Sequence, residues 1–231
     1  MPLNQYQQEV GPSLVDATPG KVPDITLLDG RYCSVEHLTV AEHYEDILDF
    51  YFTNQILSDW TYMYADPFES EEAVRQCLED YEQSDNPYFF AISDKVSGKV
   101  LGTFSLMAIT PKNRSVEMGR VILAPAIQKT RVATEAQYLV MKYVFEGLNY
   151  RRYEWKCDSL NRPSANAAIR LGFTYEGRFR NHAIYKGRSR DTDWFSIIDS
   201  EWPVLKKRFE NWLSPENFDE QGQQKRSLRD C

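Results

Sequence analysis

The sequence predicts an α+β fold in which a mixed, mostly antiparallel sheet of about seven strands is flanked by helices. Short runs rich in β-branched and aromatic residues follow one another closely through the middle of the chain, which indicates hairpins. One strongly periodic helix separates the fourth of these runs from the fifth, so we expect these two strands to be parallel. Because no further alternation of strands and helices follows, the pattern excludes a doubly wound nucleotide-binding sheet.

The N-terminal part of the predicted domain contains one strand and two helices. Residues 31–36 are expected to form the first strand, and residues 41–52 the first helix. A second helix is expected over residues 70–81, where Ser70 precedes two glutamates and provides a capping signal. The dipeptide Asn86-Pro87 then ends the helical part.

The central elements are the next three strands and a long helix. Strands are expected over residues 88–93, 100–108 and 116–123, joined by turns rich in glycine, proline and asparagine. Residues 132–145 carry apolar side chains at helical spacing and predict the long helix. The remaining expected elements are a strand at 152–157, a helix at 163–171, hairpin strands at 173–185 and 192–198, and a helix at 203–213.

The chain of 231 residues is long enough for one domain with elaborated ends. We expect one folded domain over residues 25–213, an extended arm over 1–24, which holds four prolines, and a flexible polar tail over 214–231. A hydrophobic fraction of 42% argues for a globular protein. The polar N-terminus and the lack of a long apolar run predict a cytoplasmic protein without membrane contact.

Charge and cysteine content narrow the possible partners. A net charge of −7 argues against nucleic-acid binding, and four scattered cysteines without metal-ligand spacing argue against a metal site. Residues 36–85 hold fourteen Asp or Glu against one Arg, whereas residues 151–190 hold ten Lys or Arg against three acids. Most of these charges are expected on solvated faces. The acidic part would nevertheless suit a cationic acceptor, and the basic part an anionic cofactor.

Residues 125–136 contain the most informative motif of the chain. They follow the apolar strand end Val121-Ile122-Leu123 and open the long helix, so that the free N–H groups of the helix N-terminus face the turn. Lys129 and Arg131 add positive charge in this turn. The arrangement predicts a site that binds a pyrophosphate.

Three motifs follow one another along the chain: Gln128-Lys129-Thr130-Arg131-Val132-Ala133, then Asn161 to Ala168 with Leu171 to Gly177, and finally Lys186 to Trp194. At this spacing they resemble the GCN5-related N-acetyltransferase (GNAT) superfamily, and within it the RimJ/RimL-like branch, over roughly residues 31–202. The sequence departs from the superfamily at Arg131, where a glycine is usual, and at Ala133, which replaces a second glycine. This departure leaves the detailed geometry of the turn open.

The resemblance implies that acetyl-CoA is the cosubstrate, and it implies which residues bind it. The pantetheine arm would pair with the strand end, the pyrophosphate would lie on the turn and the helix N-terminus, and Asn161 would bind the arm from the other side. Asn161 could instead cap a helix, and Lys129 could be an ordinary exposed lysine. The expected cofactor-binding residues are Val121, Ile122, Leu123, Gln128, Lys129, Thr130, Arg131, Val132, Ala133, Thr134 and Asn161.

Acetyl transfer to an amine needs a neutral amine, and the resemblance implies Glu117 and Ser164 as the catalytic residues. Deprotonating a lysine-like amine at pH 7 costs about 4.6 kcal/mol, and an N-terminal α-amine only about 1 kcal/mol. Glu117 would accept this proton, and Ser164 would donate a hydrogen bond to the departing sulfur. Glu117 could instead be a strand carboxylate paired with Arg114 or Arg120, and Ser164 could serve the cap of its helix.

The sequence leaves two interpretations open for most residues expected at the acceptor site. Trp60, Tyr62 and Tyr64 could stack on a ring or surround an alkylammonium, or they could pack as a hydrophobic lid. By resemblance, Asp191 and Trp194 would lie near the same opening, although Asp191 could pair with an adjacent arginine. We expect the acceptor to be a primary amine of a small molecule. The alternatives are a protein N-terminal amine and a catalytically silent acyl-CoA-binding module, and the protein could be a monomer or a homodimer.

Overall fold

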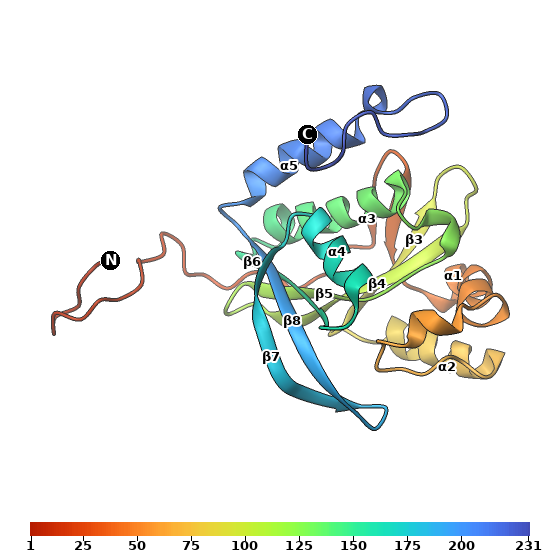
Figure 1. The fold of residues 1–231 in the computed structure, drawn as a ribbon, viewed down its shortest axis with the longest axis horizontal. Coiled ribbons are helices and arrows are strands. Elements are labelled where there is room, and N and C mark those ends of the chain that lie inside the picture. Colours follow the sequence, from red (N-terminus) through yellow and green to blue (C-terminus); the bar gives the residue numbers. More distant parts are fainter.

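A computed structural model describes residues 1–231, and its centre is an 8-stranded sheet in the order β1-β2-β3-β4-β5-β6-β8-β7 (Figure 1). All neighbouring strands are antiparallel except β5 and β6, which are parallel and are joined through α3. The strands are β1 Leu27–Asp29, β2 Cys33–His37, β3 Tyr88–Asp94, β4 Val100–Thr110, β5 Ser115–Leu123, β6 Arg152–Asp158, β7 Thr174–Tyr185 and β8 Arg188–Ile198. The predicted fold class is therefore confirmed, and the parallel pair is the predicted one.

The strand that the sequence did not reveal is β1, which has three residues and pairs with β2 at the edge of the sheet. A segment this short carries too little alternation to be recognised. The helices are α1 Val40–Leu48, α2 Glu71–Glu82, α3 Arg131–Lys142, α4 Arg162–Arg170 and α5 Trp202–Leu213. Short π-helical turns, η1 Asp49–Thr53 and η4 Tyr143–Gly147, extend α1 and α3 where the sequence predicted single longer helices. Three-residue to four-residue 3-10 turns are η2 Leu57–Trp60, η3 Pro125–Ile127 and η5 Pro215–Asn217.

The helices cover the two faces of the sheet unequally. In Figure 1, α3 and α5 lie above the sheet and α1 and α2 below it. The upper face belongs to a core cluster of 35 buried residues, and the lower face to a second cluster of 12. Strand alternation divides β6 accordingly, because Tyr153, Trp155 and Cys157 enter the upper core and the charged residues between them face the other side. No helix is both long and apolar enough to cross a membrane.

The two ends of the chain contact the domain to different extents. The first residues run outward from the sheet (Figure 1), but the chain docks from Asp16 onward, where its carbonyl accepts a hydrogen bond from Arg114 at 2.8 Å. The segment 214–231, which we expected to be a flexible tail, folds back on α5. Phe218 and Leu228 are buried in the upper core, and Trp212 donates a hydrogen bond to Gln224 at 2.8 Å. Its few apolar residues are widely spaced, which conceals them in a polar composition.

Candidate active site

The sheet opens between β5 and β6. Their pairing ends at Met118 and Trp155, although β5 continues to Leu123 and β6 to Asp158. At the same point the register between β4 and β5 shifts, and Arg120 lies in the left-handed region with φ of 51°. A bulge of this kind bends a strand and increases its twist. From Gly119 onward, the edge of β5 that faces β6 is therefore free to pair with another extended chain.

The turn after β5 presents an uncapped helix N-terminus. Gln128 donates its side-chain amide to the carbonyl of Leu123 at 3.0 Å, and the Thr130 hydroxyl donates to the carbonyl of Ile127 at 2.7 Å. The first N–H groups of any α-helix have no partner within the helix. In α3 no side chain caps them either. Lys129 is exposed and adopts a φ of 61°, which turns the chain into the helix. The turn and the first helical residues thus form a concave row of N–H donors.

The predicted cofactor-binding residues are brought together by β5, this turn and α4. Val121, Ile122 and Leu123 are half-buried on the open end of β5, whereas Val132 and Thr134 are buried beneath the helix start. Arg131 is the first residue of α3, and its φ is not positive. Its guanidinium lies 4.6 Å from the centre of the Tyr32 ring and 5.3 Å from that of Phe218. The side chain therefore swings away from the turn, which explains how arginine replaces the usual glycine.

Asn161 and Ser164 lie at the start of α4, beside the opening. The Asn161 side-chain oxygen accepts the Ser164 N–H at 3.1 Å. Asn161 therefore caps the helix, which is the alternative to cofactor binding that the sequence left open. Its amide nitrogen remains available for a ligand. The Ser164 hydroxyl accepts the indole N–H of Trp155 at 3.0 Å, which leaves the hydroxyl proton free to be donated.

Glu117 lies on the opposite face of the sheet and is 8% exposed. Its Oε2 accepts a hydrogen bond from Lys156 at 2.7 Å, while Oε1 has no such partner. Burial raises the pKa of the Glu117 carboxyl, and the Lys156 ammonium opposes this rise. Lys156 also contacts Glu154 at 2.9 Å. The partner of Glu117 is thus neither Arg114 nor Arg120 but a lysine of the neighbouring strand.

The aromatic segment 60–64 lies next to the tip of the β7–β8 hairpin. Trp60 is buried against Tyr51 and Phe68, with ring centres 5.8 and 5.3 Å away. Tyr64 is exposed, and its ring lies 5.5 Å from that of Tyr185. Tyr62, half-buried, lies between these two in sequence. The segment therefore combines both interpretations, because Trp60 packs in the core whereas Tyr64 faces the hairpin.

The two hairpin residues occupy different positions. Asp191 accepts the backbone N–H of Asn181 at 2.7 Å and forms no ion pair with its neighbouring arginines. Trp194 lies beside the ion pairs of Lys156 with Glu117 and Glu154, because the Lys156 ammonium lies 3.9 Å from the centre of the Trp194 ring. Its indole N–H is buried and has no hydrogen-bond partner. Trp194 is thus adjacent to Glu117 through Lys156, whereas Asp191 stabilises the bend of β7.

Two basic residues on the face of the sheet that carries Glu117 were not identified from the sequence. Lys156 holds both Glu117 and Glu154, and Arg190 lies over the ring of Tyr64 at 4.9 Å. Alternation along residues 152–158 could have placed Lys156 on the charged face. No signal in the sequence could have paired it with Glu117, since strand register is set by tertiary structure.

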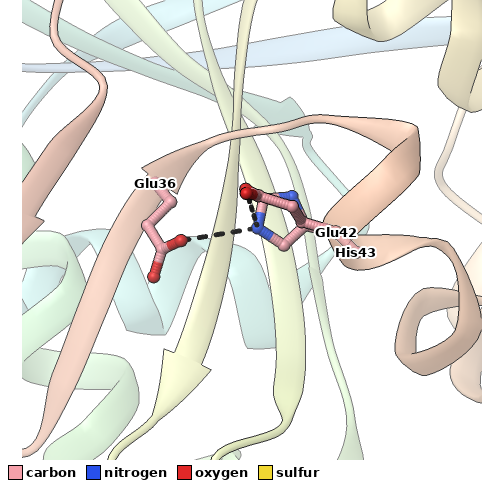
Figure 2. A group of neighbouring side chains, drawn as sticks. All are labelled: Glu36, Glu42 and His43. Atoms are coloured by element: carbon pink, nitrogen blue, oxygen red, sulfur yellow. Dashed lines mark ion pairs between the residues drawn. The ribbon is translucent and has the colours of Figure 1, made fainter.

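One further cluster, at the far edge of the sheet, brings two carboxylates to a histidine (Figure 2). The His43 Nε2 lies 3.5 Å from Glu36 and 4.0 Å from Glu42. His43 Nδ1 accepts the Thr39 N–H at 3.0 Å, which places the proton of the neutral ring on Nε2. In this tautomer the N–H of Nε2 lies 3.5 Å from the Glu36 carboxylate, and Nε2 has no free lone pair for a metal. The absence of a metal site stays a prediction.

A mixed sheet that opens between two parallel strands, with an uncapped helix N-terminus at the end of one of them, defines a class of protein. It is the class of transferases that lay a long, phosphate-bearing cosubstrate through the opening. The family model for the acetyltransferase (GNAT) domain matches residues 37–174. The chain belongs to the GNAT acetyltransferase family, in its RimJ/RimL-type branch, and is an acetyl-CoA-dependent N-acetyltransferase.

Similar proteins support this assignment over most of the chain. The crystal structure of a GCN5-related N-acetyltransferase from Brucella melitensis is 44% identical, has a TM-score of 0.91 and covers 94% of this chain and 98% of its own. The uncharacterized N-acetyltransferase p20 of Bacillus licheniformis is 30% identical over 144 residues, which are 61% of this chain and 80% of p20. Spermidine N(1)-acetyltransferase of Escherichia coli (strain K12) is 23% identical over 61% of this chain and 74% of its own.

Proposed function

We propose that this protein transfers acetyl from acetyl-CoA to a primary amine of a small molecule by direct attack of that amine. The observation that carries the proposal is that the candidate cofactor-binding groups and the candidate base lie on opposite sides of the opening in the sheet. The free edge of β5 and the uncapped start of α3 lie at its cofactor end, and the buried carboxylate of Glu117 lies on the face opposite α3. The two substrates can therefore meet in the opening from opposite faces.

On the cofactor side, each proposed contact uses a group that has a free donor or acceptor. The backbone of Val121 to Leu123 would pair with the peptide-like pantetheine arm, and the Asn161 amide would donate to it. The N–H groups of Lys129 and of residues 131–133 would bind the pyrophosphate, helped by the positive end of the helix dipole. The N–H groups of Thr130 and Thr134 already donate to the carbonyls of Ile127 and Thr130. Acetyl-CoA supplies the activated thioester, so no acyl-enzyme is needed.

On the acceptor side, Glu117 would take a proton from the ammonium of the bound acceptor, directly or through water, so that the neutral amine can attack the thioester. The Lys156 ammonium favours the ionised form of this carboxylate, while burial raises its pKa and makes it a stronger base than an exposed glutamate. Its Oε1 is the free acceptor atom. Ser164, from the other face, would donate its hydroxyl proton in a hydrogen bond to the departing thiolate.

Contacts across the acceptor opening favour a small molecule over a protein N-terminus. Lys186 donates to the Trp60 carbonyl at 2.8 Å and pairs with Asp66 at 3.1 Å, which ties the hairpin tip to the aromatic segment. A protein terminus with its flanking residues would have to break these contacts to enter from that side. Spermidine, the substrate in the name of one relative, is a primary amine of the proposed size.

Calorimetric titration with acetyl-CoA, followed by a thiol-release assay against small amines and short peptides, tests the proposal. We expect acetyl-CoA binding and turnover of at least one small amine. Turnover of peptides alone would replace the small molecule by a protein terminus. Binding without any turnover would indicate a silent acyl-CoA-binding module, and a lack of binding would overturn the proposed cofactor site.

A further inference from the structure

Arg190 is a buried cation without an anionic partner. It is the third residue of β8 and is 7% exposed. Its Nε donates to the Thr192 hydroxyl at 3.0 Å, but neither Nη group forms a hydrogen bond and no carboxylate lies within ion-pair distance. A guanidinium has five N–H donors, and a buried one is normally paired. Four donors of this side chain are therefore left for a ligand.

The register of the sheet places Arg190 on the face of Glu117. Glu117 pairs with Glu154 across β5 and β6, and Lys156 pairs with Trp194 across β6 and β8. Paired residues, and residues two apart along a strand, share a face, so Glu117, Lys156, Trp194 and Arg190 form one polar surface. The buried, unpartnered indole N–H of Trp194 is a second donor on this surface without an acceptor.

The guanidinium is held in place by aromatic rings of the acceptor opening. Its carbon lies 4.9 Å from the ring centre of Tyr64 and 5.8 Å from that of Tyr185. The Tyr185 hydroxyl donates to Asp158 at 2.8 Å, which fixes the second ring. Stacking of this kind stabilises a guanidinium through its faces and leaves its edge of N–H groups available.

The carboxylates around the opening are already engaged. Lys156 holds Glu117, Lys186 holds Asp66, and Tyr185 holds Asp158. Oε1 of Glu117 is left free by these contacts and would serve the reacting amine, whereas an anion of the acceptor would find the free edge of Arg190.

We propose that Arg190 binds an oxyanion of the acceptor, so that the substrate of this enzyme is an amine that also carries a carboxylate or a phosphate. This inference rests on the proposed amine acetyltransferase function and specifies its substrate class. The planar fork of the guanidinium matches two oxygens of such a group. With its oxyanion on Arg190, the acceptor would extend its amine along the polar surface toward Glu117.

Matched pairs of acceptors that differ in the anion test the proposal on the unaltered protein. The pairs are glycine and glycinamide, β-alanine and its amide, γ-aminobutyrate and butylamine, and O-phosphoethanolamine and ethanolamine, with spermidine as the polycationic probe. Thiol release and the mass of the acetylated product are measured for each. We expect turnover of the acidic member of at least one pair and little of its neutral partner, and the phosphate pair distinguishes the two kinds of oxyanion.

Variants then assign the preference to one side chain. Arg190→Gln should lower kcat/KM for the acidic acceptor about 100-fold, mainly through KM, because a desolvated charge pair loses one partner. Arg190→Lys should restore part of this loss. Arg188→Gln removes the same charge from an exposed position of the same strand and should change nothing. Calorimetric titration with acetyl-CoA, which should be unaltered in all three variants, shows that they fold and bind the cosubstrate.

Several outcomes overturn the inference without touching the proposed function. These are equal turnover of both members of every pair, a preference for spermidine, and a loss in Arg188→Gln as large as in Arg190→Gln. Absence of turnover with every acidic acceptor, while acetyl-CoA still binds, also counts against it. Failure to bind acetyl-CoA removes the proposed function itself.

Discussion

The two faces of the sheet perform different tasks. The face covered by α3 and α5 buries a cluster of 35 residues, whereas the face covered by α1 and α2 buries a cluster of 12. The smaller cluster lies over β3 and β4, so the β5–β6–β8 end of that face is left to Glu117, Glu154, Lys156 and Arg190. Stability thus comes mainly from one face, and the other can keep buried charges and unpaired donors, which are costly but reactive.

Glu117→Gln should give the largest effect on the charged face. If Glu117 accepts the amine proton, this change lowers kcat about 100-fold to 10,000-fold. The affinity for acetyl-CoA, measured by calorimetry, should not change. Glu154→Gln is a matched control, because that carboxylate contacts the same lysine from the opposite position in the register. An equal loss in both variants would mean that the network, and not Glu117, is needed.

Phe209→Ala tests the apolar face. Phe209 is fully buried on α5 and stacks on Tyr138 with ring centres 5.6 Å apart. We expect the free energy of unfolding in urea to fall by about 3–5 kcal/mol, as for other large-to-small core changes. The KM for the acceptor should stay as it is, since the residue lies on the other side of the sheet. A changed KM with unchanged stability would contradict the division between the faces.

Lys156→Met should shift the pH profile of the charged face. Lys156 opposes the rise in the Glu117 pKa that burial causes, so its removal raises that pKa further. Because Glu117 must be ionised to accept a proton, the acid limb of kcat/KM should move to higher pH. Lys156→Arg keeps a cation and should keep the profile close to the original. An unshifted limb in Lys156→Met would remove Glu117 as the titrating group.

Arg152→Met should give the smallest effect. Arg152 forms two hydrogen bonds with Glu176, at 2.8 and 2.6 Å, which lower the pKa of that carboxyl to about 2. A depressed pKa stabilises the fold above the ordinary value of 4.5, and this contribution is lost as the pH falls from there to about 2. Since Glu176 is partly exposed, we expect at most about 1 kcal/mol, measured as the change in unfolding free energy between these pH values.

The strand end, turn and helix start of the proposed cofactor site could be predicted from the sequence because they are contiguous. The strand end at Val121 to Leu123, the turn at Lys129 and the start of the helix follow one another, so local rules place them together. Local rules did not reveal where the Arg131 side chain would go. Its aromatic partners, Tyr32 and Phe218, come from opposite ends of the chain.

The acceptor side could not be predicted in the same way. Lys186 contacts Trp60 across 126 positions of sequence, and Arg190 contacts Tyr64 across a similar interval. The sequence gives the charges of these segments but not their pairing. The excess of acids in residues 36–85 therefore suggested a cationic acceptor, whereas the structure shows an arginine, Arg190, that has no ion-pair partner at the opening.

The parting of β5 from β6 also has a consequence for amide hydrogen exchange. Beyond Met118, the edge of β5 toward β6 has no strand to protect it, and Arg120 holds the chain in a bent conformation. Amides that point to this edge between Gly119 and Leu123 should exchange with solvent faster than those of residues 115–118. Acetyl-CoA should slow this exchange, which would make β5 a reporter of cosubstrate occupancy that requires no acceptor.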